Sequence, residues 1–449
     1  MKNIFRVSSI LGTATFLTII TGLVKNKFLA LSLGPVGLGV IAQLSSYLNT
    51  SNAISSFGMS QAVTKYVAES HDFANRYIHL KKILQSAIGV VLSLGLPICL
   101  FTILFSKKLS LVLLNNVTLY TLFVIIAIAV PLQAASQIYI SFVQGLKAVK
   151  WLASASVFTG ILGLVFLFPL VIFLRITGAA FNIVVLAGIG CCAFLYATRR
   201  LIRKEMKECH SKEPKADPDY LKKIMNFGYL RFIQSCIFPL TILAVRSLVI
   251  RHLGVFSNGI YESACAFSFL YVPLINNILW SYSYPSYCSS KDNATLSKEV
   301  NQFLKISIFI AVPMIVGIIL FRNMLVRLLF SVEFLPAVAL ISIVLIGDFL
   351  KVLIWPFNVV LMAKDKMKIA VVFELVWNTA FLILSFLMIS TYKLRGVFIM
   401  QNISLSLILL LSYIYVNKKF SVAITRDNLL LSIVSILVIV IISAFKPII

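Results

Sequence analysis

Apolar runs of about twenty residues recur along the whole 449-residue chain. Such a run is long enough to cross the hydrocarbon core of a bilayer as an α-helix. Only 12% of the residues are charged, about half the share in a soluble domain, and the mean hydropathy is +0.99. These features predict an all-α membrane protein that crosses the bilayer many times.

Charged or turn-rich breaks divide the apolar runs into thirteen expected spans. They cover residues 8–31, 36–66, 81–105, 118–143, 152–174, 178–198, 224–250, 257–287, 301–321, 335–362, 369–391, 395–416 and 429–445. Twelve of them form two sets of six, separated by the longest polar loop.

The two sets of six spans resemble each other. LGPVGLGV at 33–40 and LGVFSNGI at 253–260 both follow the first span of their set. We therefore predict an N-terminal six-helix lobe, a cytoplasmic linker, a C-terminal six-helix lobe and an extra hydrophobic segment, at 1–200, 201–222, 223–417 and 428–446. An even number of spans per lobe makes the lobes parallel repeats, which usually leave a substrate path between them near the midplane.

The net charge of +25 comes from Lys and Arg in short loops. These cations are concentrated in the loops on the same side as the N-terminus, most of all in 199–223. The positive-inside rule then places the N-terminus in the cytoplasm. The pattern favours contact with anionic membrane lipids and argues against nucleic acid as a partner.

Enzyme and metal signatures are missing from the sequence. The seven cysteines and four histidines show no metal or redox spacing, and there is no phosphate-binding loop. We expect no cofactor, no metal and no catalytic residues.

The most informative polar residues inside a span lie at 348–358. Asp348, Lys351, Trp355 and Asn358 share one helix face in an otherwise apolar run. Charges in a membrane span are costly and mark functional sites by default. The alternative is an ion pair that satisfies itself between helices.

Other charged residues in or beside the spans are further candidates for a functional site. Lys25 and Lys27 lie in the outer half of the first span and point to nearly opposite sides, so Lys27 is expected to face the path and Lys25 to border headgroups. Arg246 and Glu262 can line the path or pair across the repeated turn. Glu374 can couple an ion or be a surface charge.

Amide side chains form helical stripes in the spans. Asn49 and Asn52 lie on the second span, Gln133 and Gln137 on the fourth, and Asn277 on the eighth. An amide both donates and accepts hydrogen bonds, which suits sugar hydroxyls. The alternative role is hydrogen bonding between helices. We expect these residues, with Trp355 and Asn358, to line a cavity.

Several motifs in order resemble the Wzx-type flippases for undecaprenyl-linked oligosaccharides, the polysaccharide-transporter branch of the MOP superfamily. They are Lys27 with GPVGLG at 34–39, GMSQAVTKYVAE at 58–69, Arg246, GIYE at 259–262, IGDFLK at 346–351, Ala363 and FEL at 373–375. The match extends over about 1–416, and flippases for O-antigen and enterobacterial common antigen look most similar.

The resemblance implies two six-helix bundles that form a V around a cationic central cavity. It implies alternating access, which carries an undecaprenyl-pyrophosphate-linked oligosaccharide from the cytoplasmic to the periplasmic leaflet of the bacterial inner membrane. H⁺ or Na⁺ would be the coupling ion, and a polysaccharide polymerase and a chain-length regulator would act downstream.

Roles for the charged residues follow from this hypothesis. Cations would bind the pyrophosphate and acids would couple the ion: Lys25, Lys27, Arg246 and Lys351 for the anion, and Asp348, Glu262 and Glu374 for the ion. Two alternatives are a multidrug or cation exporter of the same superfamily, which should have an acidic cavity, and a membrane polymerase or ligase, which should have a large outside loop.

Overall fold

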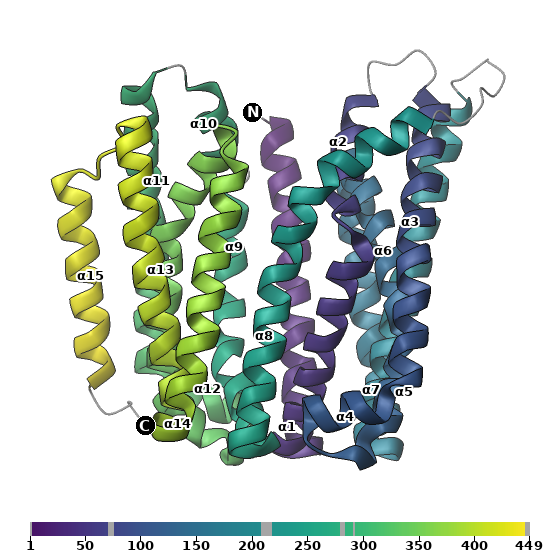
Figure 1. Cartoon of the computed structure of the whole chain (residues 1–449), viewed down its shortest axis with the longest axis horizontal. Coiled ribbons are helices and arrows are strands. Elements are labelled where there is room, and N and C mark those ends of the chain that lie inside the picture. The colour runs from purple at the N-terminus through teal and green to yellow at the C-terminus, as the bar shows by residue number, and fades with distance from the viewer. Residues whose placement is uncertain (1, 71–75, 208–217, 279–282, 291, 445–449) are drawn as a thin grey trace. The chain divides into compact units, whose positions relative to one another are not determined.

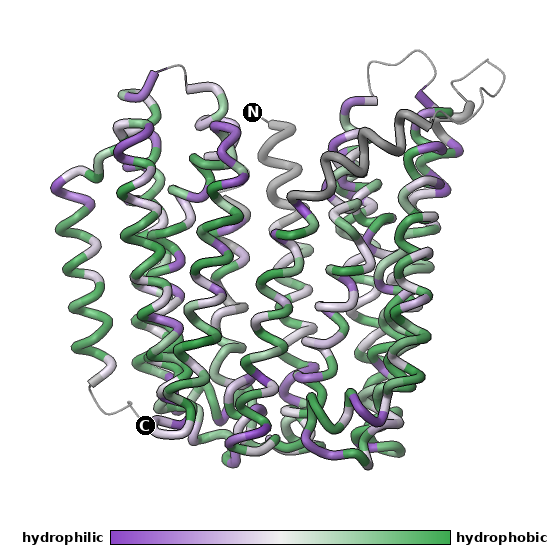
Figure 2. Tube along the Cα trace, viewed as in Figure 1, coloured by the Kyte–Doolittle hydropathy of each residue, from purple (hydrophilic) through white to green (hydrophobic). Residues whose placement is uncertain are grey.

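The computed structural model describes residues 2–70, 76–207, 218–278, 283–290 and 292–444. In this part of the chain the regular structure is helical, with short turns and no strand. This confirms the all-α prediction. Nine of the described helices are long and apolar enough to cross a membrane. Their middle sections are apolar and their ends more polar (Figure 2), as expected for helices that span a bilayer.

The helices follow one another with short connections (Figure 1). They are α1 (Lys2–Ser56), α2 (Met59–Glu69), α3 (Arg76–Leu104), α4 (Ser106–Leu114), α5 (Tyr120–Ala127), α6 (Ala129–Gly145), α7 (Val149–Lys207), α8 (Pro218–Ala266), α9 (Val272–Ile278), α10 (Tyr284–Ser289), α11 (Asn293–Leu320), α12 (Arg322–Leu329), α13 (Val338–Ala363), α14 (Met367–Phe420) and α15 (Arg426–Ala444). Three 3₁₀ segments join them: η2 (Val117–Leu119), η3 (Phe267–Leu270) and η5 (Val332–Ala337).

Four long helices each contain one non-helical residue. These residues are Gly34 in α1, Arg175 in α7, Gly254 in α8 and Lys393 in α14, all with positive φ. Contacts between the arms of α7, α8 and α14 show that each folds back as a hairpin. If each of the four helices is counted as two crossings, the nine helices account for the thirteen predicted spans.

The two halves repeat the same turn geometry. Lys147 after α6 and Asp365 after α13 both have positive φ. Past the kinks at Arg175 and Lys393, a side chain at Gly178 or Gly396 would press on the backbone carbonyl of the residue eight positions earlier. Equivalent turns at nearly constant spacing support an internal repeat.

Two compact units result from this arrangement. One comprises Met1–Leu33 and Val40–Leu243, and the other Gly34–Gly39 and Ala244–Ile449. In the first unit an apolar cluster joins α2, α3 and α6, and in the second an apolar cluster joins α13 and α14. The predicted linker 201–222 lies only partly within the described residues, and the predicted lobe boundaries stay predictions.

The second span of each half is interrupted, whereas the sequence predicted continuous helices over 36–66 and 257–287. In the first half the helix ends before Phe57 and Gly58, which both have positive φ. In the second half η3 replaces the α-helix and ends at Leu270, and Tyr271 follows it. Hydropathy does not register these breaks, because the residues on both sides remain apolar. Helices interrupted inside a membrane are typical of transporter sites.

Candidate functional site: a buried charge cluster

The first element of the site is an ion pair across the α8 hairpin. Arg246 on one arm donates from Nη2 to the Glu262 carboxylate on the other arm. The guanidinium lies 5.1 Å from the centroid of the Tyr261 ring, and this ring stacks on Phe398 of α14 at 4.8 Å. Nε and Nη1 of Arg246 are buried and have no hydrogen-bond partner among the described residues. Arg246 is therefore a cation held in place by Glu262, with two N–H-bearing nitrogens that can still donate hydrogen bonds to a ligand.

The second element is built around Asp348 of α13, whose side chain is only 1% exposed. Lys351, one turn later, donates from Nζ to Asp348 Oδ1 at 3.0 Å. The hydroxyls of Ser268 and Tyr271 donate to Oδ2, the latter at 3.0 Å. Ser268 lies in η3 and Tyr271 follows it. Asp348 therefore binds a cation and also anchors the interrupted span.

The two ion pairs belong to one cluster. Glu262 and Cys265, near the end of α8, lead directly into Ser268 of η3, which donates to Asp348, the partner of Lys351. Two cations and two carboxylates thus share a small region of the second unit. Such a cluster is expensive inside a membrane and is expected to be functional.

Each ion pair has one accessible partner and one buried partner. Lys351 and Glu262 keep 25% and 22% of their side chains exposed, against 1% and 9% for Asp348 and Arg246. A ligand can therefore reach the cluster through Lys351 and Glu262, while Asp348 and Arg246 hold their positions. The structure thus brings together four of the predicted charged residues.

Other predicted residues of the second unit lie further along α13 and on α14. Trp355 and Asn358 continue along α13 from Lys351 and are half-buried, and Asn358 Oδ1 has no partner among the described residues. Glu374 is half-buried on α14, and its backbone carbonyl accepts from Asn378. The side chain of Asn277 lies outside the described residues.

The predicted residues of the first unit lie on α1 and α6. Lys25 and Lys27 are both half-buried on the first arm of α1. Asn49 is exposed on the second arm, and Asn52 is half-buried with an unpartnered, buried Oδ1. Gln133 and Gln137 are half-buried on α6. The roles predicted for these residues stay predictions.

Ser268, Tyr271 and Cys265 are residues that the sequence did not single out. Ser and Tyr are common in membrane helices, so their identity alone carried no signal. Ser268 and Tyr271 are three residues apart, so a helix places their hydroxyls on one face. This pair of hydroxyls is the only sequence signal for them.

Comparison with known proteins now identifies the chain. Residues 28–339 match the family model described as polysaccharide biosynthesis protein, which is more than half of the chain. The chain belongs to this polysaccharide biosynthesis protein family. The predicted resemblance to polysaccharide transporters is confirmed at the level of the family.

Two characterised proteins resemble this member of the polysaccharide biosynthesis protein family along most of its length. They are lipid III flippases of Escherichia coli (strain K12) and Shigella flexneri, each 22% identical over 385 residues, which cover 86% of this chain and 91% of theirs.

Solved structures of the MOP superfamily share the fold of this family member. The lipid II flippase MurJ, in an inward closed conformation, aligns with a TM-score of 0.73 at 14% identity, covering 99% of this chain and 94% of its own. An inward-facing multidrug resistance transporter of the MATE family aligns with a TM-score of 0.76 at 13% identity, covering 90% and 94%. These similarities establish the fold and a membrane protein that crosses the bilayer many times.

Proposed function

We propose that this protein is a flippase for an undecaprenyl-pyrophosphate-linked oligosaccharide, a repeat unit of the O-antigen type. It carries this lipid from the cytoplasmic to the periplasmic leaflet of the bacterial inner membrane by alternating access, with its N-terminus in the cytoplasm. It makes and breaks no covalent bond. The family match and the likeness to lipid III flippases support this proposal.

The observation that carries the proposal is the spare donor capacity of Arg246. A guanidinium has five N–H groups in a fixed fork that fits phosphate oxygens. In Arg246 the buried Nε and Nη1 bind no acceptor among the described residues, and burial strengthens any charge-assisted hydrogen bond that they make. A pyrophosphate that reaches Lys351 meets a second cation at Arg246.

The two carboxylates supply the exchange that a transport cycle needs. A pyrophosphate that binds Arg246 and Lys351 replaces Glu262 and Asp348 as the partner of each cation. After the anion leaves on the periplasmic side, the carboxylates take up H⁺ or Na⁺ there and release it to the cytoplasm when both ion pairs form again. Asp348 also holds Ser268 and Tyr271, so this exchange changes the contacts of the interrupted span.

The remaining parts of the substrate match other predicted residues. The amides of Asn49, Asn52, Gln133 and Gln137 in the first unit suit sugar hydroxyls. The ring of Trp355 in the second unit suits the face of a sugar, while the prenyl tail stays in the lipid. Export of a drug cation is less well supported, because both carboxylates of the cluster are already paired with cations.

Complementation of a bacterial strain that lacks its own flippase tests the proposal. Wild-type protein should restore the surface glycan, and Arg246→Ala and Lys351→Ala should each reduce it at least tenfold at equal protein level. Arg251→Ala and Lys368→Ala are matched controls, since Arg251 is an exposed cation on α8 and Lys368 an exposed cation on α14. Both controls should restore the glycan fully.

Two results would contradict the proposal. One is full glycan display by both cluster variants. The other is the failure of wild-type protein to complement any strain while it confers resistance to cationic drugs.

A further inference from the structure

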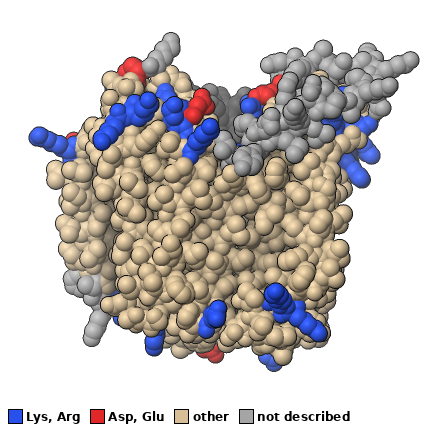
Figure 3. All heavy atoms as spheres, viewed as in Figure 1, with Lys and Arg blue, Asp and Glu red and all other residues tan. Residues whose placement is uncertain are grey.

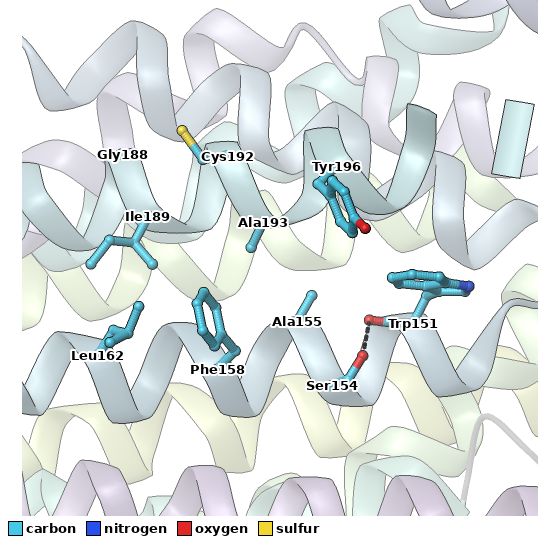
Figure 4. A pocket seen from close by; sticks show the side chains of 10 residues that line it. All are labelled: Trp151, Ser154, Ala155, Phe158, Leu162, Gly188, Ile189, Cys192, Ala193 and Tyr196. Atoms are coloured by element: carbon cyan, nitrogen blue, oxygen red, sulfur yellow. Dashed lines mark hydrogen bonds between the residues drawn. The ribbon is translucent and has the colours of Figure 1, made fainter. Parts of the chain in front are cut away.

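An apolar groove in the first unit lies outside the charge cluster. It has a volume of about 790 Å³ and runs between the two arms of the α7 hairpin. Its lining is almost entirely apolar, with Phe158 and Leu162 on one arm and Ile189 and Cys192 on the other (Figure 4). Ala155, Gly188 and Ala193 keep the arms' side chains short where they face each other.

Aromatic rings lie at one end of the groove. Trp151 and Tyr196 face each other with ring centroids 6.0 Å apart, at the end of the groove near the start of α7. Trp and Tyr prefer this depth, at the boundary between headgroups and hydrocarbon. From Trp151 to Leu162 the groove is about 16 Å long by the rise of a helix, close to the roughly 15 Å of one hydrocarbon leaflet.

Cations surround the same end. Lys150, Arg199 and Arg200 are exposed, and Arg200 Nε donates to the Tyr196 hydroxyl at 3.0 Å. The sequence from 147 to 203 contains no Asp or Glu. In Figure 3, the Lys and Arg side chains of the face in view lie toward its upper and lower margins, and a wide uncharged band separates them. An anionic group at this end therefore meets attraction from several cations and no repulsion from this segment.

We propose that the groove binds one acyl chain of an anionic glycerophospholipid, with the lipid phosphate on Lys150, Arg199 and Arg200. The apolar lining accepts hydrocarbon, the length fits one leaflet, and the cations select the headgroup. A much longer polyprenyl chain would extend beyond the groove. The groove lies within one unit and shares no residue with the charge cluster, so the lipid is a resident of the protein and is not transported.

Native mass spectrometry of the purified full-length protein tests this proposal. The protein is titrated with phosphatidylglycerol, with phosphatidylcholine of the same acyl chains and with a polyprenyl phosphate. Phosphatidylglycerol should bind most tightly. Because a cation near an anionic lipid contributes about fivefold in affinity, the double variant Arg199→Gln/Arg200→Gln should weaken phosphatidylglycerol binding by about 25-fold and leave phosphatidylcholine unchanged.

A second variant occupies the groove itself. A Cβ at Gly188 meets nothing within 4 Å, and Gly188 lines the groove, so Gly188→Leu should occupy the groove and weaken the binding of both phospholipids. Gly89→Leu on α3, which also meets nothing within 4 Å, and Lys108→Gln, an exposed cation on α4, are the matched controls and should bind as wild type.

Three results would overturn the proposal: equal affinity for the two phospholipids, no effect of Gly188→Leu, or tighter binding of the polyprenyl phosphate that Gly188→Leu abolishes. None of them bears on transport of the oligosaccharide, which the Arg246 and Lys351 variants test separately.

Discussion

At the scale of single residues, the Asp348 carboxylate both pairs with a cation and binds two hydroxyl groups of the interrupted span. Its Oδ1 accepts from Lys351, and its Oδ2 accepts from Ser268 and Tyr271. A buried carboxylate without partners would be very unfavourable, so these three donors explain how it is retained in a membrane span. The same contacts join α13 to the point where the eighth span is interrupted.

This double role predicts graded effects of substitution. Asp348→Ala leaves Lys351, Ser268 and Tyr271 without an acceptor and should destabilise the protein by about 2–4 kcal/mol. Asp348→Asn keeps an acceptor for the two hydroxyls and should cost less. Thermal unfolding of the purified protein in detergent measures both variants.

A double-mutant cycle provides the control for this prediction. Asp348→Ala/Lys351→Ala removes the uncompensated cation and should be more stable than Asp348→Ala alone. Equal unfolding temperatures for Asp348→Ala and wild type would show that the carboxylate does not stabilise the folded protein.

At the scale of helices, hydropathy predicted the spans well and their continuity poorly. The cost of placing a segment in hydrocarbon decides which segments cross, and apolar runs report this cost directly. The interruptions at Gly58 and Tyr271 depend on local backbone geometry and on partners from other helices, such as Asp348 for Tyr271. The hydropathy of a single segment reports neither its backbone geometry nor its partners on other helices.

The candidate site, like the helices, could be predicted from the sequence only in part. Arg246, Glu262, Asp348 and Lys351 could be predicted because a charge is conspicuous in an apolar run. Both pairs could be predicted as alternatives, Asp348 with Lys351 because they lie one helical turn apart, and Arg246 with Glu262 because they flank the repeated turn. The pair Arg246–Glu262 depends on how the α8 hairpin folds, and the roles of Ser268 and Tyr271 depend on the break that hydropathy missed.

The repeated glycine-rich turns interlock within the second unit. Gly34–Gly39 belongs to this unit, and Asn258 Nδ2 donates to the Gly39 carbonyl at 2.7 Å. A Cβ at Gly259 would collide with the backbone carbonyl of Pro35, and one at Gly39 with that of Val255. Glycine at both positions allows the two turns to pack backbone against backbone.

Gly259→Ala should therefore destabilise the protein by about 1–3 kcal/mol, because the backbone of the facing turn must move away. Gly317→Ala on α11 is the matched control, since its Cβ meets nothing within 4 Å. Alanine there should be neutral or slightly stabilising in a helix. Both variants are compared by thermal unfolding in detergent, and an unchanged unfolding temperature for Gly259→Ala would refute the close packing of the turns.

At the scale of the whole molecule, α15 stands outside the two repeats but extends along one of them. Near its start, Asn428 Nδ2 donates to the Asn301 side chain at 2.9 Å, close to the beginning of α11. Near its end, the carbonyl of Ser443 accepts from Arg322, just beyond the end of α11. Thus α15 runs parallel to α11 for its full length.

We predict that α15 also spans the membrane, because it accompanies α11 from Asn301 to Arg322. Thirteen crossings would put the two chain termini on opposite sides, so the cytoplasmic N-terminus proposed above predicts a periplasmic C-terminus. Alkaline phosphatase, which is active only after export, should therefore be active when fused after Ile449. The same enzyme fused after Phe420, before α15, should be inactive, whereas a fluorescent protein that folds in the cytoplasm should be bright at that point. The reverse pattern at both positions would invert the proposed orientation, and an inactive phosphatase at both would mean that α15 does not cross.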